Sequence, residues 1–250
     1  EYQFLTQFVG FILTLTFLIV LGLIVKNVFG KKICEYPIIA AQKSKLIDRF
    51  FISTDCPNIK KITKKYDVEF LKRPRKFSSD SALGDLVFLD GYRRIKEMLK
   101  KENKSIDLIV LMFANSATLN PSMIKNGISF LKKNKSYDSA VSTSIYNMWS
   151  PLRARKLDKK KFVLKPFVPF KTFGNPKTLN CDRDSQGDVY FADMSVNVVR
   201  PRCLENMSDG MLPQKWMGKK IAPIFSNAGF DIDYEWQLPQ LKYWIKKNGK

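Results

Sequence analysis

Short apolar runs alternate with longer stretches of helical periodicity over most of this chain. Runs of four to eight β-branched and aromatic residues are typical of strands, and apolar residues that recur every three or four positions are typical of helices. The pattern predicts strands at residues 49–54, 68–71 and 106–113, and helices at residues 58–66, from about 81, and at 121–131. The run at 106–113 is apolar throughout, as expected of a parallel strand covered on both faces. The alternation predicts an α/β fold with a doubly wound, mostly parallel sheet.

The sequence makes more detailed predictions about two of the helices. The helix from about residue 81 should turn one apolar face inward, made of Leu83, Leu86, Val87, Ile95, Met98 and Leu99. Residues 234–247 predict a terminal helix that is interrupted or kinked at Pro239, because proline lacks the N–H that a helix interior needs.

Residues 145–190 break the alternation and are rich in proline, lysine and phenylalanine. A solvated loop is one interpretation. A structureless loop of that length is unusual in a compact domain, so a small β-excursion from the sheet is favoured.

The first 25 residues differ from the rest, because residues 2–25 contain no charge and residues 26–250 contain all 43 basic side chains. Residues 8–25 reach the minimum length for a transmembrane helix, and the lysines after them would leave a main domain over 26–250 in the cytoplasm. Three explanations stand: a membrane anchor, a buried first strand, or a coding frame shifted upstream of Gly22. Membrane contact is expected only if the segment is an anchor.

Charge and composition narrow the possible functions. The formal net charge is +20, but the lysines are scattered and form no arginine-rich block, which argues against nucleic-acid binding and favours an anionic substrate in a cytoplasmic protein. The chain has no histidine, which excludes Ser-His-Asp and Cys-His catalysis and histidine-ligated metals. The cysteines form no C-x-x-C pair and indicate reduced, mostly buried thiols: Cys34, Cys56, Cys181 and Cys203.

Asp231-Ile232-Asp233 is the strongest candidate for chemistry. In an extended segment both carboxylates point the same way while Ile232 turns into the core. Two carboxylates on one face can hold Mg²⁺, which also takes phosphate oxygens from a substrate. Taken alone, such a pair is more often part of a solvated turn.

Other motifs accompany this pair in a characteristic order. They are Lys26-Asn27, Ser53-Thr54-Asp55, Arg73-Pro74 with Asp80-Ser81, the strand that leads to Asn115, and the segment containing Arg183 and Gln186. From about Gly22 to Trp244 the chain resembles the acylneuraminate cytidylyltransferases, the CMP-sialic acid synthetases and their relatives. That family has a nucleotide-diphospho-sugar transferase (Rossmann-like) sheet, uses Mg²⁺, and transfers CMP from CTP to the 2-hydroxyl of a nine-carbon acidic sugar.

The resemblance implies roles for individual residues. Asp231 and Asp233 match the metal-binding pair, and Lys26 and Asn27 match the end of the nucleotide loop, where the lysine addresses a phosphate. Arg73, Asp80 and Ser81 match a segment that meets the nucleotide. The sugar would be held by Arg183 and Gln186, with Arg153, Arg155 and Lys165 as further candidates. The excursion at 145–190 would form a homodimer and overlie the sugar.

Two departures from the family pattern bear on activity. Phe17-Leu18-Ile19-Val20-Leu21 stands where the family has Arg-Gly-Gly-Ser-Lys, so these residues cannot cradle a triphosphate as that loop does. Asn115 stands where many members have glutamine and proline, a variant similar to the legionaminate-like branch. A catalytically impaired nucleotide- or sugar-binding relative is therefore the alternative. We expect neither Asp231 nor Asp233 to be buried, so that their Asn variants lose turnover and keep the fold.

Overall fold

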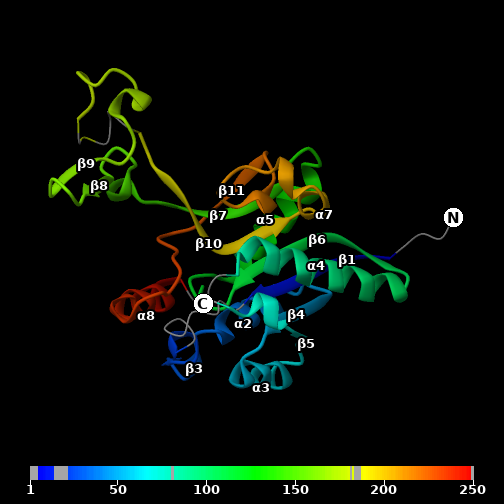
Figure 1. Cartoon of the computed structure of the whole chain (residues 1–250). Coiled ribbons are helices and arrows are strands. Elements are labelled where there is room, and N and C mark those ends of the chain that lie inside the picture. Colours follow the sequence, from blue (N-terminus) through cyan, green and yellow to red (C-terminus); the bar gives the residue numbers. More distant parts are fainter. Residues whose placement is uncertain (1–4, 14–21, 80–81, 181, 183–186, 249–250) are drawn as a thin grey trace.

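The computed structural model describes residues 5–13, 22–79, 82–180, 182 and 187–248. Their centre is a seven-stranded sheet in the order β11-β7-β10-β6-β1-β4-β5 (Figure 1). The strands are β1 (Leu5–Leu13), β4 (Arg49–Thr54), β5 (Glu69–Lys72), β6 (Lys104–Phe113), β7 (Ser139–Ile145), β10 (Tyr190–Val199) and β11 (Ile221–Phe225). Only the two pairings of β10, with β6 and with β7, are antiparallel. The mostly parallel sheet predicted from the sequence is confirmed.

Residues 5–13 of the uncharged N-terminal segment form a central strand of this sheet. β1 pairs in parallel with both β4 and β6, and Val9, Phe11 and Ile12 are buried. A strand covered on both faces needs apolar side chains all along its length, which explains the lack of charge here. A transmembrane helix over residues 8–25 is therefore wrong at residues 8–13, and no helix among the described residues is long and apolar enough to cross a membrane.

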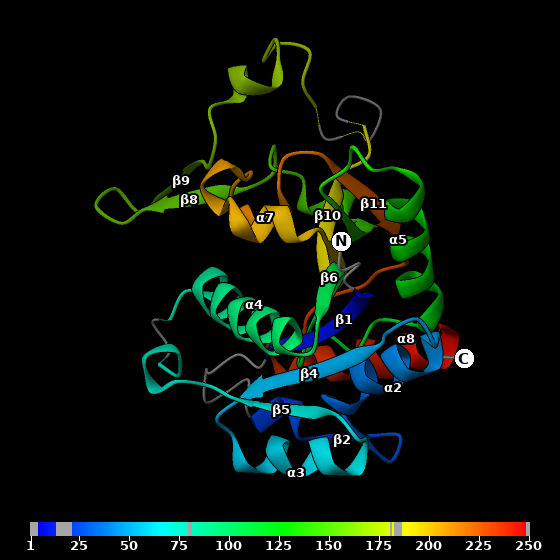
Figure 2. The same cartoon turned by 90° about the vertical axis from the view of Figure 1, so that its right-hand side faces the viewer.

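Helices cover both faces of the sheet, as a doubly wound fold requires (Figure 2). On one face α2 (Glu35–Ser44), α3 (Pro57–Lys65) and α5 (Pro121–Lys133) bury residues such as Ile38, Ile59 and Ile124 in one apolar cluster. On the other face α4 (Gly84–Lys101) and α7 (Pro201–Glu205) bury Phe88 and Cys203 in a second cluster. Short 3₁₀ turns occur at Arg75–Phe77, Asn147–Trp149 (η2), Phe170–Phe173 (η3), Met207–Asp209, Lys215–Met217 and Glu235–Gln237 (η6).

Two sequence predictions about helices need correction. In α4 the buried face is Val87, Phe88, Gly91, Tyr92, Ile95 and Leu99, whereas Leu83, Leu86 and Met98 are exposed. Leu83 precedes the first helical residue, and two aromatic residues and a glycine fill the face that it was expected to share. Pro239 does not interrupt the terminal helix: α8 (Leu238–Asn248) begins one residue before it, and the first turn of a helix tolerates proline.

Between Ile145 and Tyr190, which pair with each other in the sheet, the described residues leave it and stand out from it (Figures 1 and 2). They contain the antiparallel hairpin β8 (Arg155–Asp158) and β9 (Val163–Pro166), followed by η3. The hairpin exposes Leu157, Phe162 and Leu164. A second small hairpin, β2 (Asn27–Val28) and β3 (Lys31–Lys32), lies near the start of α2.

Three of the four cysteines lie in described residues and are free thiols. Cys34 and Cys203 are buried and Cys56 is partly exposed, in agreement with the sequence prediction. Cys181 lies outside the described residues.

Candidate active site

The candidate residues gather at one edge of the sheet. β1, β4, β5 and β6 run parallel, and the two antiparallel pairings of β10 return β7 and β11 to the same direction. The segments that follow these strands therefore meet at the carboxyl edge, where open α/β sheets bind their ligands. Asn115 follows β6, Arg73 follows β5, and Asp231 and Asp233 follow β11.

Asp231-Ile232-Asp233 lies after β11 and outside the assigned strands. Ile232 is nevertheless fully buried, in a cluster with Leu23 and Leu241. Its N–H donates to the carbonyl oxygen of Asn115 at 3.0 Å, and the Asn115 side-chain amide donates to Asp233 Oδ1 at 3.0 Å. The loop after β6 thus holds the backbone between the carboxylates and one carboxylate itself.

Asp231 lies in an unfavourable place for a charge. Its Oδ1 atom is buried and has no hydrogen-bond partner among the described residues. Burial raises the pKa of Asp231 to about 7; the nearby carboxylates of Asp233 and Asp193 contribute to the rise, and the Ser116 hydroxyl partly offsets it. As a residue Asp231 is only half-buried, so the expectation that neither carboxylate is buried fails for its Oδ1 atom alone, which the segment anchored by Ile232 turns inward.

These atoms fit a hard divalent cation. Asn115 Oδ1 is a second buried oxygen without a hydrogen-bond partner in the described part of the chain, and the Asn115 side chain already contacts Asp233. Orphaned oxygens beside two carboxylates are the donor set that Mg²⁺ prefers. No group of three or more Asp, Glu or Cys side chains with metal-binding geometry occurs in the described residues, so further ligands would come from substrate or water.

Lys26 joins this cluster through the segment after Asp233. Its ammonium pairs with Glu235, and both side chains are substantially exposed. The Lys26 backbone is fixed by Leu23 and Ile33 at the base of the β2–β3 hairpin, whose turn at Phe29-Gly30 uses two positive φ angles. Asn27 is exposed beside it. A cation on a rigid hairpin therefore faces the acidic segment.

Arg73 belongs to the same edge of the sheet but lies beyond β4. Its side chain is buried, and Nη2 donates to the Ser53 carbonyl oxygen at 2.7 Å. Burial lowers the pKa of Arg73 to about 10, and Asp55 opposes that shift. This geometry links the Arg73 and Ser53-Thr54-Asp55 motifs. Asp80 and Ser81 lie outside the described residues.

Arg155 is not brought to the carboxylate pair. It begins β8 in the excursion, where its guanidinium donates to the Leu152 and Ala154 carbonyl oxygens and lies 5.4 Å from the ring centre of Phe170. Arg183 and Gln186 lie outside the described residues, as do residues 17–21.

A hollow of about 860 Å³ adjoins the carboxylate pair. It is lined by Phe230, which precedes Asp231, and by Gln237, whose Oε1 accepts a hydrogen bond from the Asp233 N–H at 2.8 Å. Its other walls are largely aromatic and come from η2, η6 and α8: Tyr146, Trp149, Trp236, Tyr243 and Trp244. The rest of the lining consists of amide side chains, one lysine, Met148, Ala228 and Pro239.

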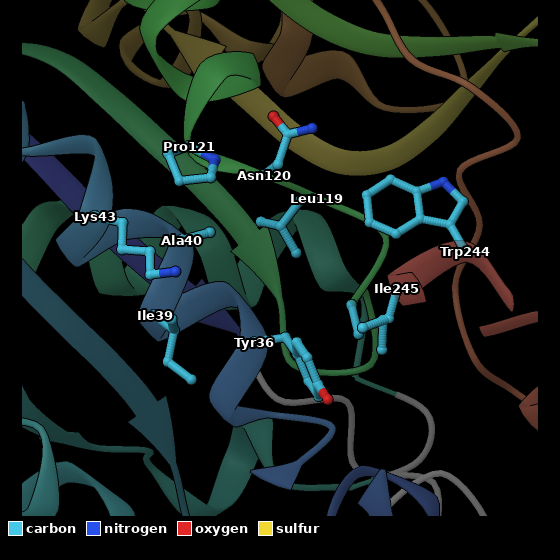
Figure 3. A pocket seen from close by; sticks show the side chains of 10 residues that line it. Tyr36, Ile39, Ala40, Lys43, Leu119, Asn120, Pro121, Trp244 and Ile245 are labelled. Carbon is cyan, nitrogen blue, oxygen red and sulfur yellow. The ribbon is translucent and has the colours of Figure 1, made fainter. Parts of the chain in front are cut away.

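α8 holds this region against the body of the protein. Trp244 Nε1 donates to the Asn227 carbonyl oxygen at 2.7 Å, and Ile245 faces Tyr36 of α2 and Leu119 across a pocket of about 40 Å³ (Figure 3). That pocket has room for about one water and none for a nucleotide. The contacts around this pocket are structural, since they fix α8, which lines the aromatic hollow, on the body of the protein.

Sequence reasoning missed several polar residues of the site. Asp193 and Ser144 are buried and lie beside Gly229, and Thr118 Oγ1 accepts from the Phe230 N–H at 2.9 Å. The only signal for Asp193 was weak, a carboxylate in a mostly apolar stretch, because buried charges are rare unless paired. The serines and Thr118 carried no comparable signal.

Comparisons with known structures agree with the fold. The structure is similar to CMP:2-keto-3-deoxy-manno-octonic acid synthetase complexed with CTP, with a TM-score of 0.66 and 10% identity over 97% of this chain and 99% of that one. It is also similar to 4-diphosphocytidyl-2C-methyl-D-erythritol synthase from Anaerococcus prevotii DSM 20548, with a TM-score of 0.62 and 14% identity over 96% of both chains. At these identities the likeness establishes the nucleotide-diphospho-sugar transferase fold alone.

Sequence similarity gives the family. A stretch of 130 residues, 52% of this chain, is 29% identical to the pseudaminic acid cytidylyltransferase and UDP-2,4-diacetamido-2,4,6-trideoxy-beta-L-altropyranose hydrolase of Helicobacter pylori (strain ATCC 700392 / 26695). The match spans about a quarter of that relative's length, 24%. The model of the cytidylyltransferase family matches residues 24–189, well over half of the chain. The chain therefore belongs to the cytidylyltransferase family of nucleotidyltransferases.

Proposed function

We propose that this protein transfers CMP from CTP to the 2-hydroxyl of a nine-carbon acidic sugar of the nonulosonic class, using Mg²⁺. The observation that carries the proposal is the pair Asp231 and Asp233 beside Asn115, with two orphaned oxygens, at the ligand-binding edge of a cytidylyltransferase sheet. The sugar class is supported by the relative named for pseudaminic acid.

The reaction is a displacement at phosphorus. The acceptor hydroxyl oxygen forms a bond to the α-phosphorus of CTP, the bond from that phosphorus to the bridging oxygen breaks, pyrophosphate leaves with the electron pair, and the hydroxyl proton passes to water. Mg²⁺ held by Asp231 and Asp233 would neutralise charge that develops on the phosphate oxygens. Lys26 would exchange Glu235 for a phosphate, since both partners are exposed enough to separate.

The aromatic hollow is the proposed site of the acceptor sugar. It adjoins the carboxylates through Phe230 and Gln237, and its ring faces and amides suit a sugar that carries acyl and methyl substituents. The exposed apolar hairpin β8–β9 is the proposed contact between two copies of the chain, where Leu157, Phe162 and Leu164 would be covered. In such a dimer, Arg155 in the excursion would contact the sugar.

The test is pyrophosphate release from CTP and Mg²⁺ with N-acetylneuraminic, legionaminic or pseudaminic acid as acceptor. The expected result is release that requires both an acceptor of this class and the metal. Asp233→Asn is the matched variant and should abolish it. Turnover of Asp233→Asn at the wild-type rate would refute the metal assignment.

The alternative is a binding protein of the same fold with little or no turnover. The observation that favours it is the apolar run at positions 17–21, where the related family carries Arg-Gly-Gly-Ser-Lys. Each donor to developing charge typically supplies about 3 to 4 kcal/mol of transition-state stabilisation, so a chain without that loop would be slow. A version with Arg-Gly-Gly-Ser-Lys at positions 17–21 separates the two proposals. Release only with the restored loop supports the impaired relative, and equal release in both versions supports the active enzyme.

A further inference from the structure

β10 carries an irregularity next to the carboxylate pair. Its pairing register with β7 shifts between Ala192 and Asn197, and Met194 has a φ of 61°, a left-handed conformation that side chains other than glycine rarely adopt. β-bulges of this kind commonly re-aim a side chain beside an active site. Here the irregular segment turns the carboxylate of Asp193 into the protein, where it is 6% exposed.

Hydrogen-bond donors surround Asp193. Oδ1 accepts from the Ser142 hydroxyl and from the Ser195 N–H at 3.2 Å, and Oδ2 accepts from the Ser144 hydroxyl at 2.7 Å. Bonds to an ionised acceptor are about twice as strong as neutral ones, which offsets the cost of burying the charge. With both oxygens occupied, Asp193 serves its neighbours rather than a substrate.

Ser144 connects Asp193 to the loop that carries Asp231 and Asp233. A hydroxyl has one proton to donate, and an ionised carboxylate can only accept, so the Ser144 proton points at Asp193. A lone pair of the same oxygen then accepts from the Gly229 N–H at 2.9 Å, and the Tyr146 hydroxyl donates to the Gly229 carbonyl oxygen at 3.0 Å. Both backbone groups of the residue two positions before Asp231 are thereby fixed.

Gly229 also packs directly against this carboxylate. A Cβ atom at Gly229 would lie 2.4 Å from Asp193 Oδ2, which real structures do not tolerate. Glycine at this position allows the backbone of the loop to rest on the carboxylate itself. The position of Asp231 relative to the sheet is therefore set through Asp193, Ser144 and Gly229.

We propose that Asp193 and Ser144 are positioning residues of the metal site, which act through Gly229 to hold Asp231 where it can bind a divalent cation. This rests on the proposed function, because the cation is part of it. Removal of partners that orient metal ligands typically weakens metal binding by 10- to 100-fold. The inference predicts a loss of that size from residues that touch neither the metal nor the substrate.

The experiment measures Mn²⁺ affinity of the full chain by electron paramagnetic resonance, with and without CTP, which needs no turnover. Ser144→Ala and the isosteric Asp193→Asn should each weaken Mn²⁺ binding at least 10-fold. Ser139→Ala is the matched control, since Ser139 is a buried serine of the same strand whose hydroxyl donates to the Met217 carbonyl oxygen at 2.7 Å. It should leave Mn²⁺ affinity unchanged.

Thermal unfolding of each variant confirms that the measured chain is folded, and two variants at separate positions keep the test usable if one fails to fold. The inference is overturned if both variants bind Mn²⁺ as the wild type does, or if Ser139→Ala loses as much affinity as Ser144→Ala. Asp231→Asn separates this failure from that of the proposed function. If Asp231→Asn also binds Mn²⁺ normally, the metal assignment itself is wrong.

Discussion

Asp231→Asn should stabilise the metal-free protein at alkaline pH while removing its activity. The pKa of Asp231 rises from an ordinary value of 3.8 to about 7, mainly because the carboxylate is buried. One pKa unit corresponds to about 1.4 kcal/mol, so the ionised carboxylate costs the folded state about 4 kcal/mol above pH 7. Asparagine has the same shape and carries no charge to bury, so the variant escapes that cost.

The sign of the pH dependence follows from linkage. Because the folded state binds the Asp231 proton more tightly than the unfolded state, the wild type loses stability as pH rises from about 3.8 to about 7. Below that window the carboxyl is neutral in both states, and the variant and wild type should be equally stable. The advantage of Asp231→Asn should reach about 1.5 kcal/mol near pH 5 and about 4 kcal/mol near pH 8.

Urea unfolding at pH 5 and pH 8.5, with a chelator present, measures this difference. A control of opposite sign is Asp138→Asn. Burial acts to raise the pKa of Asp138 but is outweighed by the backbone N–H groups of Lys220 and Lys219 and by Arg202, so the pKa is lowered. Asp138→Asn should therefore lose stability at pH 8.5. A difference between Asp231→Asn and wild type that is the same at both pH values, or that favours the wild type at pH 8.5, would refute the reasoning.

Two further predictions concern the aromatic hollow and a buried thiol. Trp236→Ala should raise the KM for the acceptor sugar about two- to tenfold and leave the KM for CTP unchanged, since an aromatic contact contributes about 0.5 to 1.5 kcal/mol. The control is Phe225→Ala, at an exposed aromatic residue outside the hollow, and an equal rise in both variants would contradict the assignment. Burial, with Glu35 adding to the effect, raises the pKa of the Cys34 thiol to about 12, so iodoacetamide at pH 8 should leave Cys34 unmodified in the folded protein, as mass spectrometry of its peptide would report. Modification at the rate of the denatured chain would contradict this.

Where one local rule decides the structure, the sequence was sufficient to predict it. β4 matches its predicted bounds, because Phe50, Phe51 and Ile52 form an apolar run that ends at a polar turn before Pro57. α5 begins at Pro121 as expected, with Asn120 capping it by accepting from the Met123 N–H. The doubly wound sheet followed from such elements in alternation.

Where two rules compete, the sequence left the answer open. A central parallel strand and a membrane helix both require unbroken apolar residues, so residues 8–13 could not be assigned until the pairings of β1 with β4 and β6 were known. The face of α4 was mispredicted because Phe11 packs directly over Gly91, a contact that comes from a strand distant in sequence. Asp193 was missed because a register shift, which leaves no pattern in the sequence, directs it inward.

In the candidate site, the Asp231 carboxylate is costly to bury, and the loop that carries it is held in place by hydrogen bonds and packing. A buried Asp231 oxygen without a partner destabilises the empty protein, and a flexible loop would relieve that cost by turning the carboxylate toward water. The loop cannot do so, because Gly229 is held through Ser144 and Tyr146, Phe230 through Thr118, and Ile232 through Asn115 and the core. If a cation binds as proposed, it would recover the free energy withheld in this way, so the constraint that weakens the metal-free fold should strengthen the affinity of the site for metal.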